Sequence, residues 1–479
     1  MRTNKQRRIR KDAFLILPLI LACGREHSGT KATCGSRDRP ETGLQGQTTA
    51  PERDSGLSAQ GFNCNLELVG QFQGEGASYG FAWFEDCAYY GTANSPQQEH
   101  RGVVVVDASD PKNPQATAYL DNPAMLEPWE SLKVHQGRKL LGGSQRLGTG
   151  FAVYDLSTDC RHPVLKGSIQ MPGSIGHAGN FTPDGLTYYV SQDFRGLGGI
   201  MPIVDVTNTS MPRWLLNWRF DGPGRPHDPF FSKDGTRGYF AQPGQFGNTV
   251  ADSSFGPNGL VILDLSDIQF RTPNPQIRGI STLFWEDGGQ AQMTLPLVIK
   301  GRPYVVFTDE AGSGGVGGRD GACARGLPPH GFARIIDISD ERNPKTISKL
   351  MLEVDDPANC PAILGNPPDI TASSSHYCNV DDAENPTMLA CSYREAGLRV
   401  FDIRDLAHPR EIAYYKAPAQ RTKFLPGSVL YGSARGGDRT TDQTPSNVRF
   451  RTDRNEIWFA SQDNGFQILK FTNGVGLAR

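Results

Sequence analysis

The sequence predicts an all-β protein, a seven-bladed β-propeller that is closed by pairing an N-terminal strand with the C-terminal blade. Three observations lead to this prediction. A short β-rich pattern recurs seven times along the 479-residue chain. Each copy lies among further short runs of β-branched and aromatic residues that end in turn residues, as the strands of a four-stranded blade do. The last copy has only three such runs, and an isolated run near the N-terminus can supply the fourth.

The repeated pattern is a glycine, a run of alternating apolar positions, and Asp-x-Ser-Asp or a near variant. Its copies begin at Gly102, Gly150, Gly199, Gly259, Gly331, Gly397 and Gly465. The β-branched run suits a strand that is buried on both faces. The aspartate begins a tight turn, because its side chain can accept bonds from the backbone amides ahead of it. The Asn-Pro that closes several copies prevents further strand pairing.

The seven copies resemble the LVIVD repeat, and the resemblance covers roughly residues 62–473. It implies a propeller and an exported bacterial lipoprotein. It implies no particular reaction, because activity in this family is poorly defined and fold alone does not fix function.

The other strands of each blade are predicted from the runs around each copy. A Tyr-rich strand such as residues 187–192 precedes the repeat, and an inner strand such as residues 177–182 precedes that. A fourth strand follows the repeat. The run at 65–72 has no partners of its own, so we expect it to pair beside residues 465–471 and complete the last blade. Closure of the ring in this way leaves no exposed sheet edge.

The N-terminus carries an export signal. Residues 1–23 combine a basic start with an apolar run that is too short to span a bilayer. They end in Ile-Leu-Ala-Cys, which resembles a bacterial lipobox and implies lipidation of Cys23. Residues 24–61 are poor in large apolar side chains and predict a disordered tether. The propeller is therefore expected over residues 62–479, anchored at the cell envelope. Gly24 after the lipid-bearing cysteine favours the outer membrane.

Eight cysteines remain if Cys23 is lipidated. In an oxidising compartment some of them should form disulfides. Cys378 and Cys391 flank one predicted hairpin and are the first candidate pair. Cys323 with Cys360 is the second.

The long insertions are predicted to lie on one face of the disc. In a propeller the connections from strand four to strand one, and from two to three, lie on the same face. Residues 241–258, 310–330, 353–375 and 416–446 are all connections of these two kinds. Long loops on a rigid scaffold commonly carry binding sites. We therefore expect a protein or small-molecule ligand on this face. The net charge of −2 argues against a nucleic-acid partner.

Three histidines are predicted at the mouth of the central channel on this face. His177, His227 and His376 enter the first strands of the third, fourth and sixth blades. Neutral imidazoles facing a common axis can bind a divalent transition metal. The corresponding position in the second blade is Trp129 or Glu130. Acidic residues that end second strands on the same face could support a metal or act as general bases; these are Asp193, Glu310, Glu395 and Asp463. Alternatively, each histidine could bond only within its own blade.

The sequence leaves two functions open. One is a binding or scaffold module, expected to be a monomer that contacts the membrane only through its lipid anchor. The other is a metal-dependent hydrolase or oxidoreductase with the histidine site at the channel mouth. No catalytic residue is assigned by a sequence motif.

Overall fold

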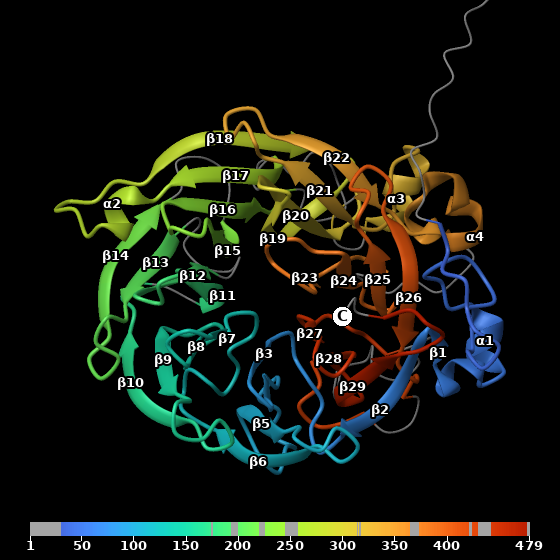
Figure 1. Ribbon diagram of the computed structural model, residues 1–479, viewed down its shortest axis with the longest axis horizontal. Coiled ribbons are helices and arrows are strands. Elements are labelled where there is room, and N and C mark those ends of the chain that lie inside the picture. The colour runs from blue at the N-terminus through green and yellow to red at the C-terminus, as the bar shows by residue number, and fades with distance from the viewer. Residues whose placement is uncertain are drawn as a thin grey trace, which may run out of the picture.

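The computed structural model describes residues 30–173, 176–192, 200–219, 226–244, 257–313, 315, 318–364, 373–420, 424–429 and 442–476. Seven antiparallel sheets are arranged in a ring around a central axis (Figure 1). The predicted all-β, seven-bladed propeller is therefore confirmed. Residues 1–29, with the predicted export signal and Cys23, lie outside the described residues. No helix in the described ranges is both long and apolar enough to cross a membrane.

Each blade consists of four strands that follow one another from the axis to the rim. The first strands are β3 (Phe81–Phe84), β7 (Lys133–His135), β11 (Gly176–Phe181), β15 (His227–Phe231), β19 (Gly289–Ile299), β23 (Cys378–Val380) and β27 (Arg449–Arg451). The second strands are β4 (Cys87–Tyr90), β8 (Leu140–Ser144), β12 (Thr187–Gln192), β16 (Arg237–Gln242), β20 (Arg302–Ala311), β24 (Met388–Ser392) and β28 (Glu456–Ser461). The third strands, which carry the repeat, are β5 (Val103–Asp107), β9 (Gly150–Asp155), β13 (Ile200–Asp205), β17 (Asn258–Asp264), β21 (Ala333–Asp337), β25 (Leu398–Asp402) and β29 (Gly465–Phe471). The outer strands are β6 (Gln115–Leu120), β10 (Val164–Gln170), β14 (Arg213–Arg219), β18 (Arg278–Trp285), β22 (Lys345–Leu350), β26 (Arg410–Lys416) and β2 (Leu66–Phe72).

The head and tail of the chain share the seventh blade, as predicted. Strand β2 pairs antiparallel with β29, and Leu66 lies opposite Phe471 at one end of the pairing. Phe72 lies opposite Phe466 at the other end. The fourth strand of this blade therefore comes from the beginning of the chain, and its first three strands come from the end (Figure 1).

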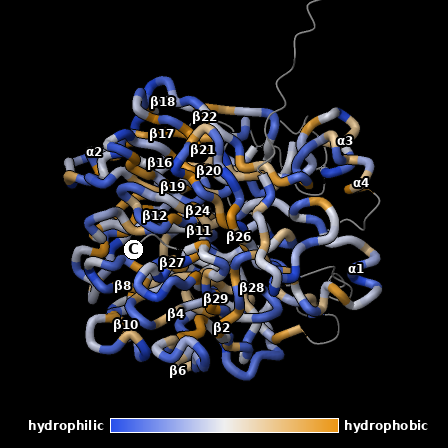
Figure 2. Tube along the Cα trace, turned by 45° about the vertical axis from the view of Figure 1, so that its right-hand side comes forward, coloured by the Kyte–Doolittle hydropathy of each residue, from blue (hydrophilic) through white to orange (hydrophobic). Residues whose placement is uncertain are grey.

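The core lies between neighbouring blades. Tyr89 and Val105 of the first blade, for example, are fully buried in one cluster with Leu141 and Ala152 of the second. The third strands pack on both faces, which agrees with the continuous β-branched runs of the repeat. Apolar residues follow the strands in the body of the ring, whereas the peripheral turns are largely hydrophilic (Figure 2).

The prediction of a disordered tether over residues 24–61 is wrong for the part that the structure describes, residues 30–61. These residues pack beside the sixth blade and contain α1 (Ala50–Asp54) and η1 (Leu57–Gln60) (Figure 1). Strand β1 (Phe62–Cys64) follows them and pairs with β26 as a fifth strand of that blade. The boundary predicted at residue 62 therefore falls at β1, which belongs to the same packed unit as the residues before it.

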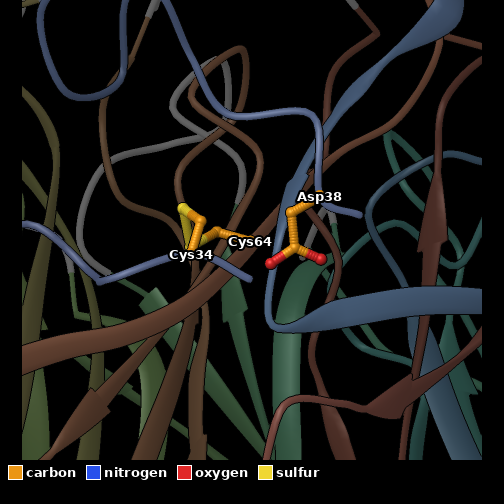
Figure 3. Close-up of side chains that lie close together, drawn as sticks. All are labelled: Cys34, Asp38 and Cys64. Atoms are coloured by element: carbon orange, nitrogen blue, oxygen red, sulfur yellow. A yellow bond between two sulfur atoms is a disulfide. The ribbon is translucent and has the colours of Figure 1, made fainter. Parts of the chain in front are cut away.

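Covalent and polar contacts hold this segment in place, although it has few large apolar side chains. Cys34 forms a disulfide with Cys64. Asp38 lies beside this disulfide (Figure 3) and accepts bonds from the Gly35 and Asn65 backbone amides at 2.7 and 2.9 Å. Both sulfur atoms are used in the disulfide, so this group of two cysteines and an aspartate does not offer thiolates to a metal. Thr49 caps α1 in a capping box with Glu52.

The same segment contributes to a buried cluster of charges on the sixth blade. The Arg399 guanidinium is fully buried and lies 3.0 Å from a Glu411 oxygen. Glu41 approaches the same guanidinium, and the Lys416 Nζ lies 3.1 Å from a Glu41 oxygen. The chain segment before the propeller thus completes the charge balance of a blade interior.

Four disulfides are present in the described residues. The predicted pairs Cys378–Cys391 and Cys323–Cys360 are confirmed. The structure adds Cys34–Cys64 and Cys87–Cys160. Four disulfides indicate an oxidising location outside the cytoplasm.

The other short helices of the described residues lie in connections between strands. They are α2 (Ser266–Gln269), α3 (Arg319–Ala324), η3 (Glu353–Asp355), η4 (Pro357–Asn359) and α4 (Cys360–Leu364). The Cys323–Cys360 disulfide joins α3 to α4, and therefore links two of the long loops that were predicted on one face.

Candidate metal centre on the propeller axis

Three histidines and one glutamate meet at the axis, where the inner strands begin. His177 and His227 lie at the start of β11 and β15, and His376 lies two residues before β23. Glu130 precedes β7 and is held by backbone pairing, because its N–H donates to the His177 carbonyl at 3.2 Å. Trp129, the alternative to Glu130 at this position, has a φ of +51°.

The imidazoles converge on one carboxylate. The Glu130 Oε2 atom lies 3.1 Å from Nε2 of His177 and 3.1 Å from Nε2 of His227. The Oε1 atom lies 3.2 Å from Nε2 of His376. The ligand atoms of Glu130, His177 and His227 all lie within 4.8 Å of one another. In a tetrahedral zinc site with bonds of about 2.1 Å, ligand atoms lie roughly 3.4 Å apart.

The groups at this centre fit a metal ion better than they fit one another. Despite the short distances, Glu130 Oε2 and His376 Nε2 are buried without a partner in hydrogen-bonding geometry among the described residues. Buried polar atoms of a folded protein nearly always have a partner. Two oxygens and three imidazole nitrogens are also ligands that divalent transition metals accept. A small movement of these side chains would place the lone pairs around a single ion.

The Nδ1 atoms of two histidines are fixed by backbone carbonyls. His227 Nδ1 lies 2.7 Å from the Gln292 oxygen, and His376 Nδ1 lies 2.5 Å from the Pro445 oxygen. Because a carbonyl can only accept, Nδ1 must carry a proton in both rings. In the neutral form of either ring, Nε2 then carries the free lone pair that can bind a metal.

Burial and charge set the protonation of this centre. Burial alone would raise the pKa of Glu130, but its contacts with the imidazoles, His177 foremost, hold that pKa well below its ordinary value. Burial lowers the pKa of His376, and the nearby Arg394 charge lowers it further, against the opposing effect of Glu130. An ionised carboxylate beside a neutral imidazole is therefore the expected state at neutral pH.

A second carboxylate lies at the open side of the centre. Glu310, at the end of β20, has an oxygen 3.7 Å from His376 Nε2 and forms an ion pair with Arg394. The Arg394 guanidinium is itself 1% exposed and donates to the Tyr79 hydroxyl at 3.2 Å. The Tyr79 ring lies 5.0 Å from that of His376. This group forms a polar wall beside the four convergent side chains.

A further ion pair lies next to the centre along the axis. Asp228 is fully buried, and its Oδ1 lies 3.4 Å from Lys133 Nζ. Burial raises the pKa of Asp228, against the lowering effects of Lys133 and His227. Lys133 balances Asp228 and Arg394 balances Glu310. The charge of Glu130 therefore has no matching cation when the histidines are neutral, and a metal ion would supply one.

The structure brings together most of the residues that the sequence placed at the channel mouth. His177, His227 and His376 meet as expected, with Glu130 at their centre and Glu310 beside them. Glu395 and Asp463 do not contact the four residues within the described part of the chain, and Ser428 Oγ donates to Asp463 at 2.8 Å. Asp193 lies outside the described residues.

Sequence reasoning missed the groups that surround the centre. Tyr79, Lys133, Asp228 and Arg394 were not among the predicted site residues. Asp228 and Lys133 had a weak signal, because each lies within three positions of a predicted channel residue on the same inner strand.

Comparison with known proteins assigns neither a family nor an activity to this chain. No family model matches the chain, and no curated protein matches it. Hydrazine synthase of Kuenenia stuttgartiensis has a similar solved structure, with a TM-score of 0.49 at 13% identity over 85% of this chain and 97% of that chain. The periplasmic gluconolactonase of Pseudomonas aeruginosa gives 0.48 at 11% identity, over 81% of this chain and 94% of that chain. A protein from Lactobacillus plantarum gives a TM-score of 0.49 at 12% identity, over 82% of this chain and 98% of that chain.

Proposed function

We propose that this protein is a metal-dependent hydrolase that holds a divalent transition metal ion, zinc in preference, on the propeller axis. Glu130, His177 and His227 are the expected ligands, and His376 supports the second oxygen of Glu130. The observation that carries the proposal is the convergence of three imidazole Nε2 atoms on one buried carboxylate at 3.1–3.2 Å. A two-histidine, one-glutamate ligand set is used by catalytic zinc sites.

The burial of the centre favours hydrolysis over oxygen chemistry. The His177 and His227 side chains are 13% and 12% exposed, whereas His376 is fully buried. Little room is therefore left for exchangeable ligands, which suits a four-coordinate site with one open position. Iron oxygenases with two histidines and one carboxylate need more open positions. A bound divalent metal would lower the pKa of a coordinated water and provide a nucleophile near neutral pH.

The neighbouring side chains have roles that agree with this chemistry. Glu310 lies at the open side, where it can accept a proton from an attacking water. Arg394 holds Glu310 in position and contributes positive charge where a substrate oxygen would gain negative charge. Tyr79 offers a hydroxyl beside the same guanidinium.

Metal content tests the proposal directly. Wild-type protein reconstituted with Zn²⁺, Mn²⁺ or Fe²⁺ and dialysed should retain about one equivalent of one of these ions. Glu130→Gln keeps the shape of the side chain and removes the charge, and His177→Gln removes a ligand; both should lose the ion. His408→Gln is the matched control, because His408 is 65% exposed on the sixth blade. The proposal would be refuted if the reconstituted and dialysed wild type retained no more metal than the buffer background.

Activity is tested on a panel of nitrophenyl esters and phosphates. Hydrolysis should be abolished by a chelator and restored by the retained metal. Glu310→Gln should keep the metal but lower kcat by about 10²-fold or more, as expected when a general base is lost. A Glu310→Gln variant with unchanged kcat would remove Glu310 from the mechanism.

The proposal places this enzyme at the bacterial cell envelope, as a lipoprotein with the LVIVD type of repeat. The lipobox-like residues before Cys23 and the four disulfides support export. Cys23→Ser should release the protein from the membrane fraction. A variant that still sediments with membranes would require a different anchor.

A binding or scaffold role is the second candidate. It is favoured by the Cys323–Cys360 disulfide, which joins two long loops into one reinforced surface. If this role is correct, disruption of the disulfide will abolish capture of a partner while Glu130→Gln has no effect on it.

A further inference from the structure

The axis contains a second feature, a cavity of about 220 Å³. Four of its lining residues each lie three positions after a residue of the metal centre, on or leading into the same inner strand. The pairs are Glu130 and Lys133, His177 and Asn180, His227 and Phe230, and His376 and Asn379. Three extended residues span at most about 10 Å. The cavity therefore lies within about that distance of the metal centre, toward the face of the first-to-second-strand turns.

Hydrogen-bond donors with no acceptor face this cavity. Lys133 is 9% exposed, and its ammonium makes no hydrogen bond to any described residue; its ion-pair partner, Asp228 Oδ1, is 3.4 Å away. The Asn180 and Asn447 amide oxygens accept the N–H groups of the residues that follow them, at 3.0 and 2.8 Å. Their Nδ2 groups find no acceptor among the described residues. A ligand that completes these bonds must be rich in acceptors.

The charge around the cavity is positive. Arg449 is 9% exposed, and its guanidinium lies 4.5 Å from the Trp458 ring centroid and 6.0 Å from that of Trp83, a lining residue. No carboxylate forms an ion pair with Arg449 in the described ranges, and its Nη1 atom has no hydrogen bond. Lys133 is paired with Asp228, whereas Arg449 has no such partner, so the balance of these three charges is positive and favours an anion.

Most of the remaining wall is apolar and aromatic, and Phe81, Trp83, Phe230 and Leu295 line the cavity together with the donors. Two further polar side chains, Gln136 and Asn379, already donate to the Trp83 and Val448 carbonyls. Apolar and aromatic side chains with a few convergent polar groups are typical of small-molecule sites. At about 30 Å³ for each water, the volume has room for roughly seven water molecules, which is the size of a small organic acid.

We propose that this cavity binds a small organic carboxylate. The carboxylate group accepts bonds from Lys133 and from the Asn180 and Asn447 amides, and the hydrocarbon part packs against Phe81, Trp83 and Phe230. The site is separate from the metal centre and does not depend on the proposed reaction. The Lys133–Asp228 ion pair lies between the cavity and the metal centre.

Calorimetric titration with a panel of acetate, lactate and benzoate tests the proposal. At least one of these should bind wild-type protein saturably, whereas benzamide and glucose should not. The double variant Lys133→Met, Asp228→Asn removes both charges and leaves no unpaired buried ion. It should bind the carboxylate about tenfold or more weakly, because a bond to a charged group is lost. Asn447→Ala should weaken binding by a smaller factor. Lys112→Met, an exposed lysine, is the matched control.

The Glu130→Gln variant separates this site from the metal centre, because a carboxylate could also bind a metal ion. Binding in the cavity should persist unchanged in Glu130→Gln, with or without zinc. Loss of binding in that variant would assign the carboxylate to the metal and overturn the proposal. Equal binding of benzamide, or undiminished binding to the Lys133→Met, Asp228→Asn variant, would overturn it as well. So would the absence of binding by every carboxylate of the panel.

Discussion

The replacement Glu41→Gln tests whether the segment before the propeller is part of the folded unit. Glu41 contacts the buried Arg399 guanidinium and Lys416, and its side chain is 6% exposed. The change keeps the size of the side chain and removes its charge. Arg399 then keeps its ion pair with Glu411, whereas Lys416 loses its ion-pair partner.

The expected loss of stability follows from this arrangement. Removal of one partner from a buried ion pair costs about 3–5 kcal/mol, because the remaining charge is left without compensation. Unfolding entropy is about 2.1 cal/mol/K per residue, or roughly 1 kcal/mol/K for a chain of this length. The melting temperature should therefore fall by about 3–5 °C. If residues 30–61 were a disordered tether, Glu41→Gln would not change the melting temperature.

The effect should also depend on pH. Burial alone would raise the pKa of Glu41, but Arg399 and Lys416 hold that pKa below its ordinary value. A carboxyl with a lowered pKa stabilises the fold fully above its unfolded value of about 4.3. Below that pH its contribution is lost as the group becomes protonated. The difference between wild type and Glu41→Gln should be constant near neutral pH and shrink in acid.

Differential scanning calorimetry and urea denaturation measure this difference. Arg404→Gln is the control on the same blade, because Arg404 is 70% exposed in its pair with Asp402. That pair should contribute only about 0–1 kcal/mol. Ordinary surface substitutions change the free energy of unfolding by no more than about 0.5 kcal/mol. The reasoning would be refuted if Glu41→Gln changed the free energy of unfolding at neutral pH by no more than that.

Two further predictions concern the core. Leu66 is fully buried and Leu68 is 39% exposed on the same closing strand. Leu66→Ala should therefore lower the free energy of unfolding by about 2–5 kcal/mol in urea, and Leu68→Ala should have a much smaller effect; equal effects would contradict the closure described here. Burial raises the pKa of Asp309 to about 6, against the effects of Arg334 and Asn258. Because this pKa is raised, wild type should lose up to roughly 3 kcal/mol of stability as pH rises from about 4 to 6. Asp309→Asn should remove that slope in a pH series of urea titrations, and an unchanged slope would assign it to another group.

The fold could be predicted because its signals are local. The first six copies each carry their own strand, aspartate turn and proline, and the seventh carries the strand, so seven copies predict seven blades without any long-range information. Closure followed from a count of strands in the last copy. The histidines could be placed because His177 and His227 occupy equivalent positions relative to the turns of their blades.

The features that the sequence did not predict depend on contacts between residues far apart in the chain. The composition of residues 24–61 predicts disorder, because composition carries no information about partners elsewhere in the chain. The described part, residues 30–61, is held by a disulfide and by Glu41, whose partner Arg399 is 358 positions away. The choice between Trp129 and Glu130 also depended on backbone geometry, since the positive φ of Trp129 is not visible in the residue pattern. Arg394 meets Glu310 only after two blades have packed together.

The shared seventh blade has a consequence for how the protein is made. The first long strand of the chain pairs with the last one, and almost the whole polypeptide separates them. A chain that leaves the ribosome or a secretion channel N-terminus first must therefore keep β2 unpaired until β29 has emerged. During that interval the growing row of blades presents an open edge at each end, and chaperones are expected to guard both. Residues 465–471 are those that turn an arc of sheets into a closed disc.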